Sequence, residues 1–290
     1  MSIQLIPYKP AGTIGSGPYV LREYKPDTGV DVSALSITYT GAHTDYGMVT
    51  MSDGARYRLL AFTASGTLSI EQPVNCEVCV VGGGSKGRAG GSSGGGVGGA
   101  GAYLKNQSVS AYNGGSVVIG AAQGASSIAD VSVNAVGGYF PSLNGGTGGG
   151  GGGTGDGMSK YPFEDMSYSL WAGKPHCGGG GQGAYYEDVD EHGSNIRGYS
   201  GGDGGTNGSN GYPTGSSWVS SPSGGVGGSY GSGAGSSYGG GSNGGNATYY
   251  GSGGGGGIYH KKFDGGSGIG LGGSGYQGIV YMRIPEEQAA

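Results

Sequence analysis

The chain has 290 residues, of which 77 are Gly and 22 are Tyr, and its formal net charge is −5. The acidic balance and the lack of a Lys/Arg cluster exclude electrostatic binding of nucleic acid as a main activity. No apolar stretch is long enough to cross a bilayer, so we expect a soluble chain with no membrane insertion. The abundance of Tyr and the charged content of only 11% also argue against a disordered low-complexity chain.

Residues 1–70 contain ordinary amounts of Gly and alternate short extended segments with turns. No segment has the periodicity of a helix. We therefore expect a β-rich region at 1–70 that attaches the following Gly-rich body to something larger. Strands are predicted at 34–40, 47–52, 56–62 and 67–70, with Asp53-Gly54 as a hairpin turn.

Strand character continues beyond this region. Residues 75–81 form the strongest predicted strand, and the apolar run 278–284 could pair with it. The polar tail 285–290 is expected to fray. Further strands are predicted at 102–104, 116–119 and 129–136.

Glycine tracts dominate residues 71–284, with unbroken runs at 148–153, 178–181 and 253–257. An isolated glycine tract is a flexible coil, because Gly loses the most backbone freedom on folding. In the left-handed threefold extended helix, however, N–H and C=O groups point outward and can bond to neighbouring rods that carry no side chains. We therefore expect a mainly β and irregular fold without helices, in which packed glycine rods form the body and the inserts emerge as loops.

Several motifs carry a resemblance to a known family. They are Tyr57-Arg-Leu-Leu-Ala-Phe-Thr-Ala-Ser-Gly-Thr-Leu-Ser-Ile70, Cys76-Glu-Val-Cys-Val-Val-Gly-Gly-Gly84, Gly94-Gly-Gly-Val-Gly-Gly-Ala-Gly-Ala-Tyr103, Ser116-Val-Val-Ile-Gly120 and Tyr276-Gln-Gly-Ile-Val-Tyr-Met-Arg-Ile284. This succession resembles the glycine-rich domain at the ends of bacteriophage tail fibres. In plan it is similar to the tail-fibre tip adhesins of T-even-like phages, over about residues 55–284.

The resemblance implies a polyglycine II sandwich at 71–284, whose exposed loops bind an outer-membrane protein or a surface glycan of the host bacterium. It also implies that the N-terminal region attaches to a tail-fibre or other virion protein, and that the chain is made in the host cytoplasm and located at the tail-fibre tip. The inserts 158–172 and 184–197 are long and acidic, so no particular receptor carries over.

Two other functions are compatible with a glycine-rich body. One is a structural virion appendage, such as a collar, baseplate or capsid decoration, in which the body is a spacer. The other is ice binding by flat faces of stacked rods, which needs regular Thr, Ala and Ser positions rather than many Tyr.

Aromatic residues of the inserts are the predicted receptor contacts. Tyr with Ser, Gly and Asn is the composition of antibody-like loops, in which rigid rings give contact area at a low entropic cost. The alternative role for each ring is to cover tract ends in a small conventional core. The candidates are Tyr161, Phe163, Tyr168, Trp171, Tyr185, Tyr186, Tyr212, Trp218, Tyr249, Tyr250 and Tyr259.

Motif spacing does not support catalytic, metal or nucleotide chemistry. Residues 82–87 fit GxGxxG, but at this Gly content such matches arise by chance, and no helix follows. The acidic stretch 187–192 lacks EF-hand spacing and is better explained as a solvated loop. We expect Cys76, Cys79 and Cys177 to be inert buried thiols rather than a zinc site. Without a GxSxG elbow we also expect no enzyme activity and no cofactor.

Overall fold

The computed structural model describes residues 30–51, 54–91, 95–96, 98–128, 133–135, 161–163, 176–180, 183, 185–188, 196–199 and 243–287. These residues form strands and extended segments with no helix among them, which confirms the expected mainly β class for the described part of the chain. They therefore include no helix that could span a bilayer.

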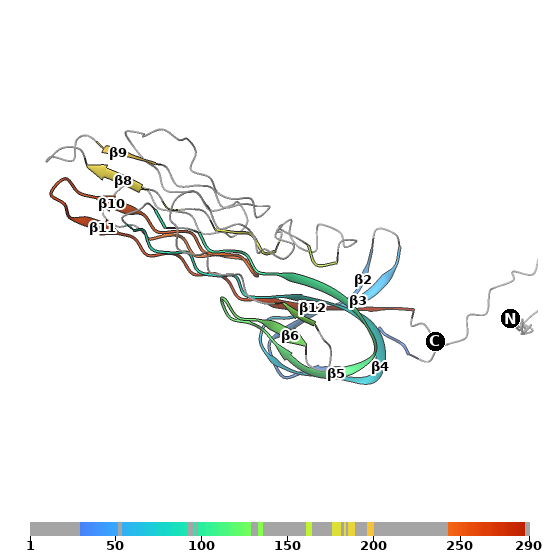
Figure 1. Cartoon of the computed structure of the whole chain (residues 1–290). Helices are drawn as coiled ribbons and strands as arrows, with labels where there is room; N and C mark the ends of the chain where they lie inside the picture. The colour runs from blue at the N-terminus through green and yellow to red at the C-terminus, as the bar shows by residue number, and fades with distance from the viewer. Residues whose placement is uncertain are drawn as a thin grey trace, which may run out of the picture.

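Two β-sheets lie at opposite ends of an elongated body (Figure 1). We call the end with the larger sheet the base and the end with the smaller sheet the distal end. The larger sheet has the order β2 (His43–Thr50), β3 (Arg56–Phe62), β12 (Ile279–Pro285), β4 (Gly66–Val81), β5 (Leu104–Val118), β6 (Ser126–Ile128) and β7 (Val133–Ala135), and β1 (Ile37–Tyr39) pairs with β4. The smaller sheet has the order β11 (Ser267–Ile269), β10 (Tyr259–Lys261), β8 (Tyr185–Asp188) and β9 (Ile196–Tyr199).

Strand β12 lies between β3 and β4 and is antiparallel to both, so that Val280 is opposite Phe62 on one side and Val80 on the other. This confirms the expected pairing of the last strand with residues 75–81. The boundary expected between residues 70 and 71 falls inside β4, and strands from both sides of it form one sheet. A central strand supplied by the end of the chain thus joins the two expected regions.

Two strands are longer than the sequence indicated. Strand β4 is continuous across residues 71–74, and register shifts against β5 on either side of Val74 accommodate Pro73, as bulges commonly do. Strand β5 includes the polar residues between the strands expected at 102–104 and 116–119, because its partner β4 supplies the pairing. Within the strand expected at 129–136, the structure describes residues 133–135, which form β7 and pair antiparallel with β6.

The central strands of the larger sheet are buried on both faces, as most of β12 and the second half of β3 show. Cys76 packs with Phe62 in one hydrophobic cluster, and Cys79 packs with Leu59 and Cys177 in a second cluster. Cys76 and Cys79 thus take opposite faces, as strand alternation predicts, and all three thiols are free and buried. Each fully buried Leu or Phe side chain contributes about 1.5–3 kcal/mol, so the base has an ordinary hydrophobic core.

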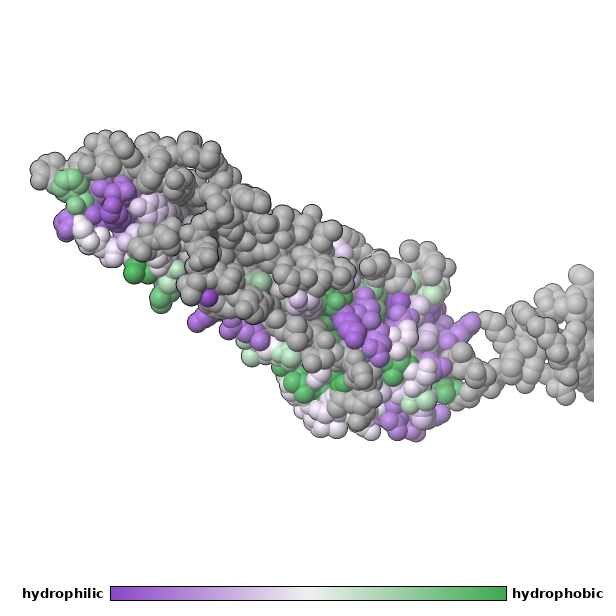
Figure 2. All heavy atoms as spheres, viewed as in Figure 1, coloured by the Kyte–Doolittle hydropathy of each residue, from purple (hydrophilic) through white to green (hydrophobic). Residues whose placement is uncertain are grey.

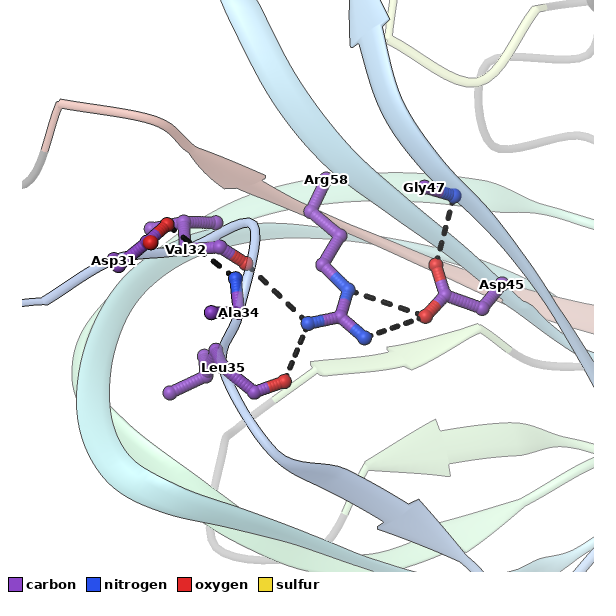
Figure 3. Close-up of polar contacts among 7 residues, drawn as sticks. All are labelled: Asp31, Val32, Ala34, Leu35, Asp45, Gly47 and Arg58. Carbon is purple, nitrogen blue, oxygen red and sulfur yellow. Dashed lines mark hydrogen bonds and ion pairs between the residues drawn. The ribbon is translucent and has the colours of Figure 1, made fainter.

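One arginine ties the first described segment to the edge of this sheet (Figure 3). The Arg58 guanidinium donates to Asp45 Oδ2 through Nε (3.1 Å) and Nη2 (2.7 Å), and through Nη1 to the carbonyl oxygens of Val32 and Leu35. Asp45 Oδ1 also accepts the N–H of Gly47, which has a φ of 67° at a bulge in β2. Burial acts to raise the pKa of Asp45, but the bonds and charge of Arg58 outweigh it and hold that pKa below its ordinary value.

The glycine tracts between the sheets are joined by backbone hydrogen bonds. We call residues 252–258 the central tract, since it bonds to every other tract described here. Three successive N–H groups of this tract donate to three different tracts: Gly253 to Gly178 O (2.8 Å), Gly254 to Ser85 O (3.0 Å) and Gly255 to Gly245 O (2.9 Å). Its carbonyl oxygens accept N–H groups from two further tracts, 95–102 and 270–278.

Bonding partners advance by three residues along each tract. Tracts 82–91 and 270–278 run antiparallel, and their bonds are Gly84 N to Tyr276 O, Gly87 N to Gly273 O and Gly90 N to Gly270 O, at 2.8, 2.8 and 3.0 Å. This repeat differs from the two-residue repeat of a β-strand. It directs bonds to several sides of one tract rather than to the two sides of a sheet.

Close approach of the tracts leaves no space for a Cβ atom at several glycines of the central tract. A Cβ atom added to Gly253, Gly254, Gly256 or Gly257 would overlap a backbone carbonyl oxygen of a neighbouring tract. Gly91 differs, because an added Cβ there meets no atom within 4 Å and its φ is not positive.

We expect Gly254→Ala to destabilise the protein by about 3 kcal/mol, because the methyl group can be accommodated only by separating two hydrogen-bonded tracts. Thermal unfolding followed by circular dichroism should show a melting temperature lower by roughly 5–10 °C. The matched control, Gly91→Ala, should change stability by less than about 1 kcal/mol. Equal effects of the two substitutions would show that tract packing does not limit stability.

Candidate functional site

The distal sheet grows directly out of the glycine tracts. Residues 177–180 and 183 run parallel to the central tract, and these two segments precede β8 and β10 in the chain. These strands also pair in parallel, with Tyr185 opposite Tyr259. The two rings stack with centroids 5.7 Å apart and planes inclined by 10°. Tyr259 is buried and Tyr185 is half-buried, so this pair covers the tract ends.

One ion pair and one histidine–carboxylate contact connect β8 with β10. Lys261 Nζ lies 2.7 Å from Glu187 Oε1, and His260 Nε2 lies 2.9 Å from Asp188 Oδ2. The hydrogen bond and negative charge of Glu187 raise the pKa of Lys261. In the described part of the acidic stretch 187–192, Glu187 therefore forms an ion pair with Lys261 and Asp188 contacts His260 within the sheet.

The β10–β11 hairpin carries large hydrophobic side chains on its surface. Phe263 in the turn is 58% exposed, Ile269 on β11 is 51% exposed and Leu271 is 63% exposed. Figure 2 shows hydrophobic residues at this end of the described surface. Among the receptor contacts predicted from the sequence, Tyr259 is the only one that lies in this hairpin. The sequence signal for the hairpin is Asp264-Gly265-Gly266 between two strand-like runs.

Phe163 lies at the base. It is buried, and its ring centroid is 4.6 Å from the guanidinium carbon of Arg283, while the Tyr57 centroid is 4.5 Å from the same atom. Arg283 Nη2 also donates to Glu77 Oε2 at 2.8 Å. Half-buried Tyr161 packs against the same hydrophobic cluster. Phe163 thus takes the alternative role given above, closing a conventional core.

Tyr249 and Tyr250 pack around a buried histidine, also at the base. The His176 ring is fully buried, with centroid distances of 4.9 Å to Tyr249, 6.2 Å to Tyr250 and 5.6 Å to Tyr281. Its Nε2 lies 3.0 Å from the Tyr281 hydroxyl. Burial lowers the pKa of His176 from 6.5 to about 3 and raises that of Tyr249 to about 12. Both side chains are therefore neutral at neutral pH.

The predicted contacts thus divide between the two ends of the body. Tyr161, Phe163, Tyr249 and Tyr250 lie at the base, and Tyr185, Tyr186 and Tyr259 lie in the distal sheet. Tyr168, Trp171, Tyr212 and Trp218 lie outside the described residues. Within the residues that are described, no group of three or more His, Cys, Asp or Glu is placed to hold a metal ion.

We expect His176 to make stability depend on pH. Because its folded pKa of about 3 lies below the ordinary 6.5, the unfolded chain binds a proton that the folded chain does not. Its contribution is fully present above pH 6.5 and is lost as the pH falls toward 3, by up to about 1.4 kcal/mol per pH unit.

The measurement is urea unfolding of the wild type and of His176→Gln at pH 7, 6 and 5. Contributions of carboxylates common to both proteins cancel in the difference, which should shift in favour of the variant as the pH falls. His43→Gln is the control, since His43 is exposed, and it should follow the wild type. A constant difference between wild type and His176→Gln would contradict the prediction.

Comparisons with protein-family models, with curated proteins and with solved structures found no match. Function is therefore inferred from the residues and their geometry.

Proposed function

We propose that the chain is a phage receptor-binding adhesin, which attaches the tail-fibre tip of a virion to a molecule on the bacterial surface. The observation that carries the proposal is the separation of a base with a hydrophobic core from a small distal sheet with exposed hydrophobic side chains. An adhesin needs one end for the virion and another for the host, held apart by a stiff body.

We infer that the body is a sandwich of polyglycine II helices. The three-residue repeat of hydrogen bonds supports this, because polyglycine II has three residues per turn and no internal hydrogen bonds. The presence of both parallel and antiparallel neighbours around the central tract also supports it, as does the lack of space for Cβ atoms. Such a body is stiff because each tract is held from several sides.

The base is the end suited to the virion. Both ends of the described chain lie there: Glu286 N–H donates to Arg56 O on β3, and Arg58 two residues later holds the carbonyl of Val32. A tail-fibre or other virion protein bound through the N-terminal region would therefore meet the base and leave the distal sheet free. The base would then be the single point at which the chain is attached to the virion.

A structural virion appendage is the second candidate. The elongated body favours it equally, since a spacer needs only length and stiffness. A spacer has no need, however, of exposed Phe263, Ile269 and Leu271 at the end away from its attachment. The two functions can be distinguished by testing whether the purified chain competes with the phage for the host surface.

The test adds purified full chain in excess to host cells before a phage that carries the chain. We expect the rate of irreversible adsorption to fall several-fold, because the free protein occupies the receptor. A phage of the same host with a different adhesin is the control and should adsorb normally. If the purified chain neither binds the cells nor slows adsorption, the adhesin proposal fails and the structural appendage is favoured.

A further inference from the structure

The turn between β10 and β11 is fixed by its own hydrogen bonds. Lys262 N–H donates to Gly266 O (2.9 Å), Gly265 N–H donates to Lys262 O (3.1 Å), and Gly266 N–H donates to Asp264 Oδ1 (2.9 Å). Gly265 has a φ of 84°, which its lack of a Cβ permits at low cost. A turn ordered before it binds loses little conformational entropy on binding.

Phe263 is the aromatic residue that this rigid turn displays. It is 58% exposed, in contrast with the buried Tyr259 on the preceding strand, and it belongs to neither hydrophobic cluster of the base. A single exposed hydrophobic residue is common on protein surfaces. Ile269 on β11 and Leu271 just after this strand are also exposed.

Among the charged residues of the hairpin, one lysine next to Phe263 in the sequence is free to pair with a partner molecule. Lys261 is paired with Glu187, and the Asp264 carboxylate is used by the turn. Lys262 is exposed, and no residue in the described part of the chain forms an ion pair with it. An acidic group on a partner would complement this lysine.

We propose that Phe263 is the anchor that this turn inserts into a hydrophobic pocket of a bacterial surface protein, with Lys262 facing an acidic residue at the rim. The proposal rests on the proposed adhesin function. A protein partner is favoured over a glycan because Phe263, Ile269 and Leu271 offer no hydrogen-bonding groups. Buried aromatic anchors of this kind carry much of the energy of protein interfaces.

The test titrates the full chain and its variants onto intact host cells, with portions of the cells treated by proteinase or by periodate. We expect Phe263→Ala to weaken binding about ten-fold or more, and Phe263→Leu to retain part of the affinity. Lys262→Glu should weaken binding most at low salt. Proteinase treatment should abolish binding, and periodate oxidation of surface glycans should leave it unchanged.

Tyr46→Ala is the matched control, because it removes a 46% exposed ring from β2 at the base. It should bind like the wild type, and all variants should keep the wild-type circular dichroism and melting temperature. Wild-type affinity in Phe263→Ala overturns the anchor while the adhesin function stands. Binding that resists proteinase but not periodate overturns the protein partner. A wild-type chain that binds no cells overturns the adhesin function, and the anchor with it.

Discussion

The structure depends on backbone hydrogen bonds between glycine-rich chain segments, which approach one another where Gly has no side chain. In most proteins side chains separate the elements and supply the energy of packing, whereas the central tract is in direct contact with the carbonyl oxygens of its neighbours. Most of its N–H and C=O groups bond to backbone groups of neighbouring tracts, which avoids the cost of burying unpaired polar groups. Gly is required there because any Cβ would separate the tracts. The glycines at these close approaches are thus a structural requirement of the described body, whereas Gly91 has room for a Cβ.

Different interactions stabilise the two ends of the body. At the base, the tracts meet a sheet whose central strands are buried on both faces, and rings such as Phe163 and Tyr249 complete its packing. At the distal end, two parallel tracts continue as β8 and β10, and cross-strand pairs hold them together: Tyr185 with Tyr259, and Glu187 with Lys261. Among the exposed hydrophobic residues at this end, Phe263 lies in the turn beyond these pairs, Ile269 lies opposite Tyr259, and Leu271 follows β11.

Charge is used sparingly and is mostly neutralised locally. Arg283 is buried between aromatic rings and bonded to Glu77, and Arg58 is bonded to Asp45 and to backbone carbonyls. A buried guanidinium is tolerated only where such partners satisfy its donors. In the described part of the hairpin, the exposed Lys262 differs from these arginines because no ion pair neutralises its charge.

The sequence by itself determined the β-rich class, the strand at 56–62 and the pairing of the last strand with residues 75–81, because these follow from local apolar composition. It also indicated that glycine tracts must contact one another. Only the tertiary structure decided that β4 and β5 run on through polar residues, since their pairing is supplied by a strand distant in the chain. It also decided which rings are buried at the base and which lie distally. Composition is similar in all the inserts, whereas the end at which each insert leaves its tract depends on how the tracts stack.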